Sequence, residues 1–177
     1  MSYFHPQEKK RIPKILEYLQ QGKDVALVSD AGTPGIADPG FPLIREALDQ
    51  GIDVIPIPGP SAVTAALSAS GLPTHRFLFL GFPSAKKEAS RKFLQSLKDE
   101  SGTLIFFLPS RKLHSFLKII QTTLGERKIV IARELTKMHE EFIRGNPGEL
   151  LKSLGMKPLK GELTILVEGR QKKSSSY

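Results

Sequence analysis

Two glycine- and proline-rich stretches constrain the fold of this chain more than any other feature. The first, SDAGTPGIADPG at 29–40, holds three glycines and two prolines, and the second, PIPGPSAV, lies at 56–63. Each follows an apolar run and precedes a helical pattern. In open α/β sheets a strand, a loop and a helix follow one another in this way, and ligands bind outside the carboxyl ends of the strands. Because glycine lacks Cβ, such loops let the backbone approach a ligand closely.

Residues 1–73 alternate between helical and strand patterns. Apolar residues at 12, 15, 16 and 19 predict a first helix, and those at 43, 44, 47 and 48 predict a second. The runs VALVS at 25–29 and DVIPI at 53–57 predict strands, and PSAVTAALSAS predicts a helix closed by Gly71. This alternation favours a parallel sheet with helical crossovers.

The second half predicts a further α/β domain. RFLFLGF, TLIFFL, KIVIAR, EEFIRG and ELTILVE read as strands, and helices are expected around 86–98 and 111–124. Asn146 is expected to be the N-cap of a short helix. GLPTH at 71–75 resembles a hinge. We therefore expect an N-terminal domain over 1–73, a C-terminal domain over 74–170 and a tail over 171–177.

The positive charge is confined to the second half of the chain. The net charge is +8, divided into −2 for residues 1–73 and +10 for the remainder. This asymmetry favours a phosphate-rich partner, although a solvated basic surface explains the charge equally well. Cysteine is absent, the four histidines form no ligand pair, and no apolar run approaches the ~18 residues of a membrane span. We expect no metal site and a cytoplasmic protein.

The segment RELTKMHEEFIRG at 133–145 is too polar for a core. Its carboxylates and its lysine are candidates for a general base and for a cation that stabilises negative charge. A structural salt-bridge network is an equally good interpretation, and His139 is interpreted as a surface or structural residue. The catalytic candidates are Glu134, Lys137, Glu140 and Glu141.

Taken in order, these motifs resemble the tetrapyrrole-methylase superfamily, and more narrowly its ribosomal RNA small-subunit ribose 2′-O-methyltransferase I family. The resemblance rests on VALVSDAGTPGIADPGFPLI, IPIPGPSAVTAALSASGLPTHRFLFLGF, RELTKMHEEFIRG and KGELTILVEG. It implies a two-domain α/β fold, with an incomplete parallel N-terminal domain followed by a mixed-sheet domain. It also implies S-adenosylmethionine as methyl donor, a cytidine ribose of small-subunit ribosomal RNA as acceptor, and a homodimer.

Matching the motifs residue by residue gives the expected contacts. The cofactor would be lined by Asp30, Ala31, Gly32, Thr33, Ile36, Pro60, Ser61, Ala62, Phe107 and Leu108. The basic half would contact RNA phosphates through Lys86, Lys87, Arg91, Lys92, Arg111 and Lys112.

Two departures from the family pattern leave alternatives open. About fifty residues that precede the matched region in the family, with a strand and a TPIGN-like loop, are absent, so a truncated chain, a misassigned start or a reduced protein is expected. FFLPSRKL at 106–113 replaces the family's FYESPHRL, so the roles of the lost acidic and histidine side chains are not carried over. The competing hypotheses are a non-catalytic RNA- or ribosome-binding remnant and a methyltransferase acting on a tetrapyrrole or a protein side chain.

Overall fold

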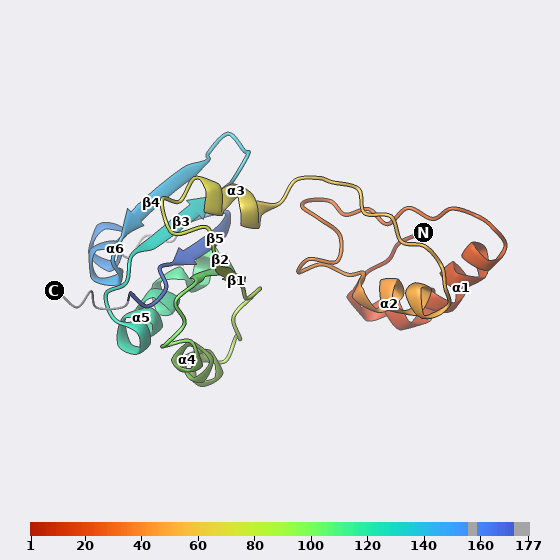
Figure 1. The fold of residues 1–177 in the computed structure, drawn as a ribbon. Coiled ribbons are helices and arrows are strands. Elements are labelled where there is room, and N and C mark those ends of the chain that lie inside the picture. Colours follow the sequence, from red (N-terminus) through yellow and green to blue (C-terminus); the bar gives the residue numbers. More distant parts are fainter. Residues whose placement is uncertain (156–158, 172–177) are drawn as a thin grey trace. The chain divides into compact units, whose positions relative to one another are not determined.

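The computed structural model describes residues 1–155 and 159–171 of the chain. Contacts divide the chain into two compact units, Met1–Ser61 and Ala62–Tyr177, and each is described by itself (Figure 1). Of the predicted tail at 171–177, only its first residue lies within the described part. No helix among the described residues is both long and apolar enough to cross a bilayer.

The first unit is built on two helices that pack through one small apolar core. A 3₁₀ turn, η1 (His5–Gln7), leads into α1 (Glu8–Gln20), and α2 (Phe41–Asp49) follows the first glycine-rich stretch. Ile12, Leu16 and Leu43 are buried at their contact. Both helices were predicted from apolar spacing, and the structure confirms them.

The prediction of two strands in this unit is wrong, because the structure contains neither. Residues 25–29 and 53–57 form no strand, and Val28, Ile55 and Ile57 are each exposed by 78% or more. A parallel strand is stable only with a hydrogen-bonded neighbour, and neither segment has one here. The apolar runs were identified correctly, but pairing is a tertiary property that a run does not encode.

The second unit contains a mixed five-stranded sheet in the order β1-β2-β5-β3-β4 (Figure 1). β1 and β2 are parallel, and the remaining neighbours are antiparallel. All five strands lie where the sequence predicted them. Their bounds are β1 (Phe77–Phe79), β2 (Thr103–Pro109), β3 (Ile129–Arg133), β4 (Glu141–Gly145) and β5 (Glu162–Val167).

Helices cover both faces of this sheet (Figure 1). On one face, α4 (Lys87–Ser96), α5 (Leu113–Leu124) and α6 (Pro147–Ser153) bury apolar side chains against β2, β3 and β5. A 3₁₀ turn, η2 (Ser110–Lys112), begins α5. On the other face α3 (Ala62–Ser68) packs against β5 through Val63, Ala66 and Leu67. The sheet is therefore the core of the second unit.

Polar contacts hold the residues that follow α3 against the sheet of the second unit. The Arg144 guanidinium of β4 donates to the Ala69 carbonyl at 2.7 Å, and the Thr103 hydroxyl donates to the Pro73 carbonyl at 2.7 Å. In this structure α3 thus packs with the second unit, whereas the sequence grouped it with residues 1–73. The functional domain division after residue 73 stays a prediction.

The N-cap predicted at Asn146 is confirmed and gives a stability test. Its side chain accepts from the Glu149 amide at 2.9 Å, while the Glu149 carboxylate accepts from the Asn146 amide, which completes a capping box. Asn146→Ala should lower the free energy of unfolding by about 1 kcal/mol, measured by urea denaturation. Asn146→Asp keeps an acceptor and should lose much less, and an equal loss in both variants would contradict the cap.

Candidate functional site

The first glycine-rich loop folds on itself and leaves part of its backbone open. Gly40 has φ 149°, and a Cβ there would lie 3.0 Å from Leu27 Cδ2 and 3.3 Å from Gly35 Cα, so the ends of the loop approach closely. Gly32 has φ 73°, and a Cβ there would meet no atom within 4 Å. The Gly32 carbonyl accepts from the Ser29 hydroxyl at 3.4 Å, whereas the side of the backbone where a side chain would stand is open.

A buried carboxylate anchors the end of this loop. Glu8, on α1, is only 5% exposed, and its Oε1 accepts from the Gly40 amide at 3.1 Å. Its Oε2 lies 2.8 Å from His5 Nδ1. Burial, together with the negative charge of Glu8, raises the pKa of Tyr3 to about 12. Because the buried carboxylate accepts from the buried Gly40 amide, it fixes where the loop passes into α2.

The two glycine- and proline-rich loops meet in the first unit. The Thr33 hydroxyl donates to the Pro60 carbonyl at 3.0 Å, although the two residues are far apart in the chain. The Ser29 hydroxyl donates to the Ala31 carbonyl at 3.3 Å and tightens the start of the first loop. Sequence reasoning named both loops as cofactor contacts, and this hydrogen bond brings them side by side.

The expected cofactor residues fall into two groups. The first unit holds Asp30, Ala31, Gly32, Thr33, Ile36, Pro60 and Ser61. Ala62 begins α3 in the second unit, and Phe107 and Leu108 lie in β2. Leu108 as a whole is 2% exposed and packs in the core with the apolar side chains of α5. The roles of these residues stay predictions.

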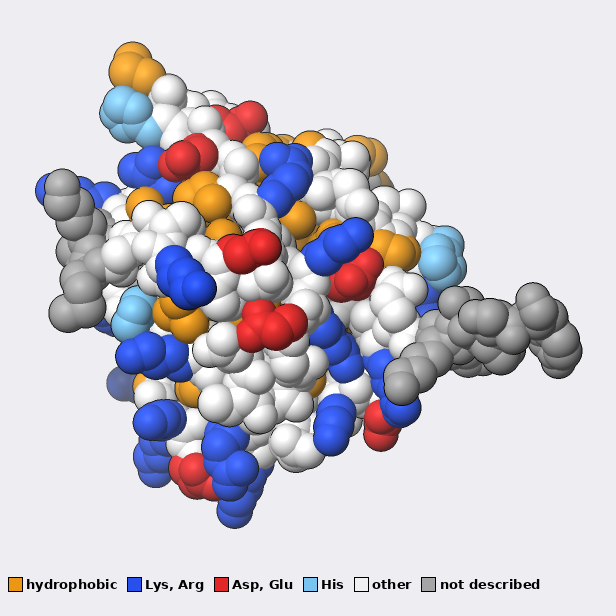
Figure 2. All heavy atoms as spheres, turned by 90° about the vertical axis from the view of Figure 1, so that its left-hand side faces the viewer, with side chains coloured by type: hydrophobic (Ala, Val, Ile, Leu, Met, Phe, Trp, Pro, Cys, Tyr) orange, Lys and Arg blue, Asp and Glu red, His pale blue; other side chains and the backbone are white. Residues whose placement is uncertain are grey.

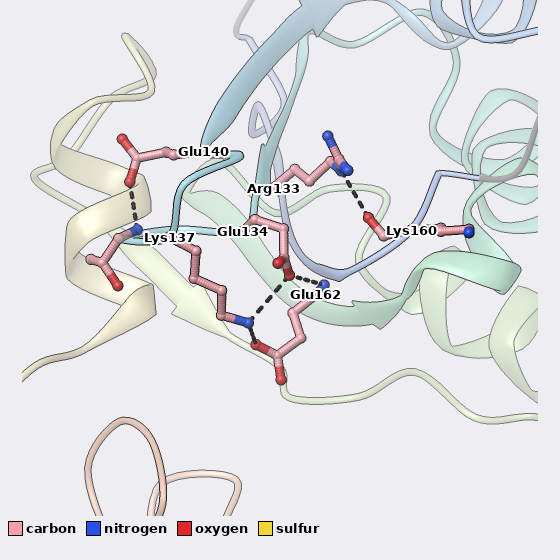
Figure 3. A network of polar contacts seen from close by, with 7 residues as sticks. Arg133, Glu134, Lys137, Glu140, Lys160 and Glu162 are labelled. Carbon is pink, nitrogen blue, oxygen red and sulfur yellow. Dashed lines mark hydrogen bonds and ion pairs between the residues drawn. The ribbon is translucent and has the colours of Figure 1, made fainter.

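The polar segment predicted as catalytic forms a connected network (Figure 3). Lys137 Nζ lies 3.2 Å from Glu134 Oε1 and 2.7 Å from Glu162 Oε2. The Glu134 carboxylate also accepts from the Glu162 amide at 2.8 Å. Glu162 was quoted in a motif but was given no role, and only the pairing of β3 with β5 reveals its place here.

The charges of this network favour fixed ions rather than a proton acceptor. The Glu162 amide, and after it Lys137, hold the pKa of Glu134 below its usual value. Hydrogen bonds to Glu162 and Glu134 raise the pKa of Lys137. A carboxylate with a lowered pKa is a weak base near neutral pH, and a lysine with a raised pKa stays protonated. Glu134 is therefore poorly suited to remove a proton, whereas Lys137 is a stable cation.

The other two candidates also have partners. Glu140 Oε2 accepts from the Thr136 amide at 2.6 Å, and Glu141 Oε2 lies 3.2 Å from Arg133 Nη1. Thr136 has φ 65°, a strained conformation for a β-branched residue, and Glu134 has φ 49°. Such strain needs a surrounding structure that enforces it, and the carboxylates of this segment supply part of it. Catalytic roles for the four candidates stay predictions.

The predicted RNA-binding residues lie in α4 and just before it, and in the turn that precedes α5. Lys86 precedes α4, which carries Lys87, Arg91 and Lys92, and Arg111 and Lys112 lie in η2 before α5. Lysine and arginine side chains are frequent on the face shown in Figure 2, most densely at its lower edge, the level of α4 in Figure 1. Arg91 is paired with Glu88, 2.6 Å away.

Comparison with known proteins identifies the class of this fold. The methyltransferase CobJ is similar in structure, with a TM-score of 0.67 and 22% identity over 93% of this chain and 74% of that one. A uroporphyrin-III C-methyl transferase from Thermus thermophilus, solved with S-adenosyl homocysteine, gives a TM-score of 0.56 at 18% identity, over 93% of this chain and 74% of that one. The chain therefore has the α/β fold of these two methyltransferases.

The sequence comparisons are more specific. The family model for tetrapyrrole (corrin/porphyrin) methylases matches residues 4–151. The ribosomal RNA small subunit methyltransferase I of Thermotoga maritima is 43% identical over 97% of this chain and 77% of its own length. That of Escherichia coli O157:H7 is 45% identical over 93% of this chain and 58% of its own length. The chain belongs to the tetrapyrrole methylase family, in the group of these ribosomal RNA methyltransferases.

These findings confirm the fold class, the family and the enzyme class predicted from the motifs. The chain is a member of a methyltransferase family that uses S-adenosylmethionine. It spans about three quarters of the Thermotoga maritima relative and 61% of the one from Pasteurella multocida.

The hydrogen bond between the two loops gives a binding test. Thr33→Val keeps the shape of the side chain but removes the donor to Pro60, so the loops lose their direct connection. We expect S-adenosylmethionine to bind roughly 3- to 10-fold more weakly, the range that one neutral hydrogen bond contributes, measured by isothermal titration calorimetry. Thr33→Ser keeps the hydroxyl and should bind almost as well as the parent chain. Equal affinity of Thr33→Val and the parent would contradict a role for this bond.

The network around Glu134 gives a pH test. Because the pKa of Glu134 is lowered in the folded state, its charge stabilises the fold above the ordinary carboxyl pKa, and this contribution is lost on acidification. Glu134→Gln should therefore unfold at a lower temperature at neutral pH, and the difference from the parent should shrink as the pH falls below about 4.5. Thermal melts across this range measure both effects.

A control separates this effect from general charge removal. Among the described residues, the Glu168 carboxylate accepts one hydrogen bond, from the Gln171 side-chain amide at 3.1 Å. Glu168→Gln should lower the unfolding temperature at neutral pH less than Glu134→Gln does. A Glu134→Gln variant with a pH-independent difference would rule out the linkage.

Proposed function

We propose that this chain, on its own or as part of a longer protein, transfers a methyl group from S-adenosylmethionine to the ribose 2′-hydroxyl of a cytidine in small-subunit ribosomal RNA. The observation that carries the proposal is the Thr33–Pro60 hydrogen bond, which joins the two loops in a chain 43% identical to a ribosomal RNA small subunit methyltransferase I. The 2′-O position and the cytidine come from the motif resemblance.

The first unit would hold the methyl donor against bare backbone. The backbone at Gly32 faces open space, and Asp30, next to it in the loop, offers a carboxylate for a hydroxyl or an ammonium group. Glu8 and Thr33 keep the loop in place from its two sides. The cofactor supplies an electrophilic methyl group when bound, so the main task of these residues is alignment at roughly 3–3.5 Å from the attacking oxygen.

The polar segment would assist the acceptor. The 2′-oxygen forms a bond to the methyl carbon as the carbon–sulfur bond breaks, and the hydroxyl proton must leave. Lys137 is held as a cation by Glu134 and Glu162, and it is the candidate best suited to stabilise negative charge developing on that oxygen. Of the carboxylates, Glu141 is paired among the described residues with the Arg133 guanidinium alone and is the better candidate base.

The basic second half would position the RNA. Phosphate contacts from α4 and η2 orient a strand without reading its sequence. The ribose must leave a helix or come from a single strand before its hydroxyl can react, since RNA is modified in accessible segments. A homodimer and a cytoplasmic location, where ribosomal subunits are met, are part of this proposal.

One observation supports a tetrapyrrole acceptor, and two features of the sequence favour RNA. Solved structures with this fold include uroporphyrin-III C-methyl transferases, whose acceptor is a tetrapyrrole. The charge of +10 over residues 74–177 and the segment ELTKMHEE favour RNA instead. The non-catalytic RNA-binding remnant differs from both enzymes in having no use for the cofactor.

A methyl-transfer assay tests the proposal. Incubation with methyl-labelled S-adenosylmethionine should label isolated small ribosomal subunits and leave uroporphyrinogen unlabelled. Lys137→Met should reduce the rate at saturating cofactor, whereas the control Lys152→Met, at an exposed site in the last turn of α6, should not. Calorimetry completes the test, because cofactor binding without transfer to either acceptor would contradict the RNA acceptor, and no cofactor binding would favour the remnant.

Salt dependence tests the electrostatic part. If several lysines and arginines contact phosphates, RNA affinity should fall roughly 10- to 100-fold between about 50 and 200 mM salt. Fluorescence anisotropy with a labelled oligoribonucleotide measures this dependence. An affinity that does not change over this range would exclude binding through the basic residues.

A further inference from the structure

Four of the chain's ten phenylalanines gather at the β1 side of the sheet. Phe77 and Phe79 alternate along β1 and so share one face, and Phe79 and Phe107 pack together on the face that α3 covers. The Phe79 and Phe107 ring centroids are 4.8 Å apart, and the Phe107 and Phe82 centroids are 5.6 Å apart. We call Phe79, Phe107 and Phe82 the aromatic row.

The outer end of the aromatic row is exposed although it is held in place. Phe82 is 59% exposed, and Phe77 beside the row is 42% exposed, whereas α3 packs farther along the sheet, on β5. Gly81 turns the chain after β1 with φ 61°, and its carbonyl accepts from the Phe107 amide at 2.9 Å. The backbone thus holds the Phe82 ring against Phe107, and the ring presents a pre-arranged flat surface.

Positive charge lies next to this surface in the chain. Lys86 ends the connection from Phe82 to α4, where its amide donates to the Ser84 hydroxyl at 3.2 Å, and Lys87 begins the helix. Residues 74–177 carry a net charge of +10. Proteins that bind single-stranded nucleic acid combine these two elements, aromatic rings on which bases stack and basic side chains along the backbone.

The aromatic row lies at the end of the sheet where ligands of α/β proteins usually bind. β1 and β2 are the parallel pair of this sheet, and Phe107 and Phe82 lie at and just beyond their carboxyl ends. Ligands of α/β sheets bind outside these ends. A nucleotide that leaves its helix for modification loses its stacked neighbours, and an exposed aromatic ring can replace one of them.

We propose that the aromatic row stacks a base of single-stranded RNA on Phe82, while Lys86 and Lys87 contact the adjoining phosphates. This inference deepens the proposed function and rests on its RNA acceptor, but it assigns a binding residue that the family motifs did not. RNA is favoured over an uncharged ligand because the neighbouring lysines complement a polyanion. The cofactor's adenine and a second copy of this chain are the other possible occupants, and the experiment separates them.

The test compares variants of the full chain that differ only at the ring. Phe82→Leu keeps an apolar side chain but removes the π-face, and it should weaken binding of a short single-stranded oligoribonucleotide roughly tenfold by fluorescence anisotropy. Phe82→Trp should bind at least as well as the parent. Because the chain contains no tryptophan, that variant also carries a single indole whose fluorescence RNA should quench. Phe4→Leu, at an exposed ring in the first unit, should bind RNA like the parent.

Each outcome decides the proposal. A tenfold loss in Phe82→Leu with unchanged S-adenosylmethionine affinity, together with indole quenching in Phe82→Trp, would support it. Unchanged RNA affinity in Phe82→Leu would overturn it while leaving methyl transfer to small subunits, and so the proposed function, intact. An equal loss of cofactor affinity would assign the row to the adenine, and a changed sedimentation coefficient would assign it to a second copy; both overturn the proposal.

A failure of the proposed function would give a different set of results from a failure of the stacking proposal. A parent chain that binds no RNA and labels no ribosomal subunit would remove the RNA acceptor itself, and the stacking proposal with it. Circular dichroism of both variants establishes that they fold. If Phe82→Leu does not fold, the indole of Phe82→Trp still decides, since no quenching by RNA would overturn the proposal.

Discussion

The insertion of β5 between β2 and β3 is the constraint on which the second unit depends. β1 pairs with β2 and β3 pairs with β4, and β5, the last strand of the described residues, joins these two pairs into one sheet. Its side chains reach both cores, Leu163 and Ile165 on the side of α5 and Leu166 on the side of α3. Without this strand neither face of the sheet is complete, because each core lacks the residues that β5 contributes.

The same insertion organises the polar segment. The amide at the start of β5, from Glu162, binds the Glu134 carboxylate, and the Glu162 side chain binds Lys137. A strand distant in sequence therefore supplies partners to the strained turn at Glu134, while Glu140 of the segment itself accepts from the Thr136 amide. This explains why the segment combines two properties that its sequence offered as alternatives. It is a structural network, and that network holds Lys137 as a cation in a defined position.

The first unit is held together in a different way. Its apolar core is small, and polar contacts hold its loops, the buried bond of Glu8 to Gly40 and the exposed bond of Thr33 to Pro60. A Cβ at Gly32 would meet no atom within 4 Å, and this open side of the backbone is the feature that connects the unit to the methyl donor of its family. The two units thus divide the work that we propose: backbone recognition of a cofactor in one, and recognition of a polyanion by lysines and aromatic rings in the other.

The sequence by itself determined the helices, the five strands of the second unit, the cap at Asn146 and the family, because each depends on local patterns or on motifs of contiguous residues. It predicted strands at 25–29 and 53–57 that do not form, because a strand requires a partner that the run itself does not specify. Only the tertiary structure showed that Glu8 binds the end of the first glycine-rich loop, that Glu162 pairs with Lys137 and that Phe82 packs against Phe107. These three contacts join residues far apart in the chain, and their existence depends on packing and strand order, which no local pattern encodes.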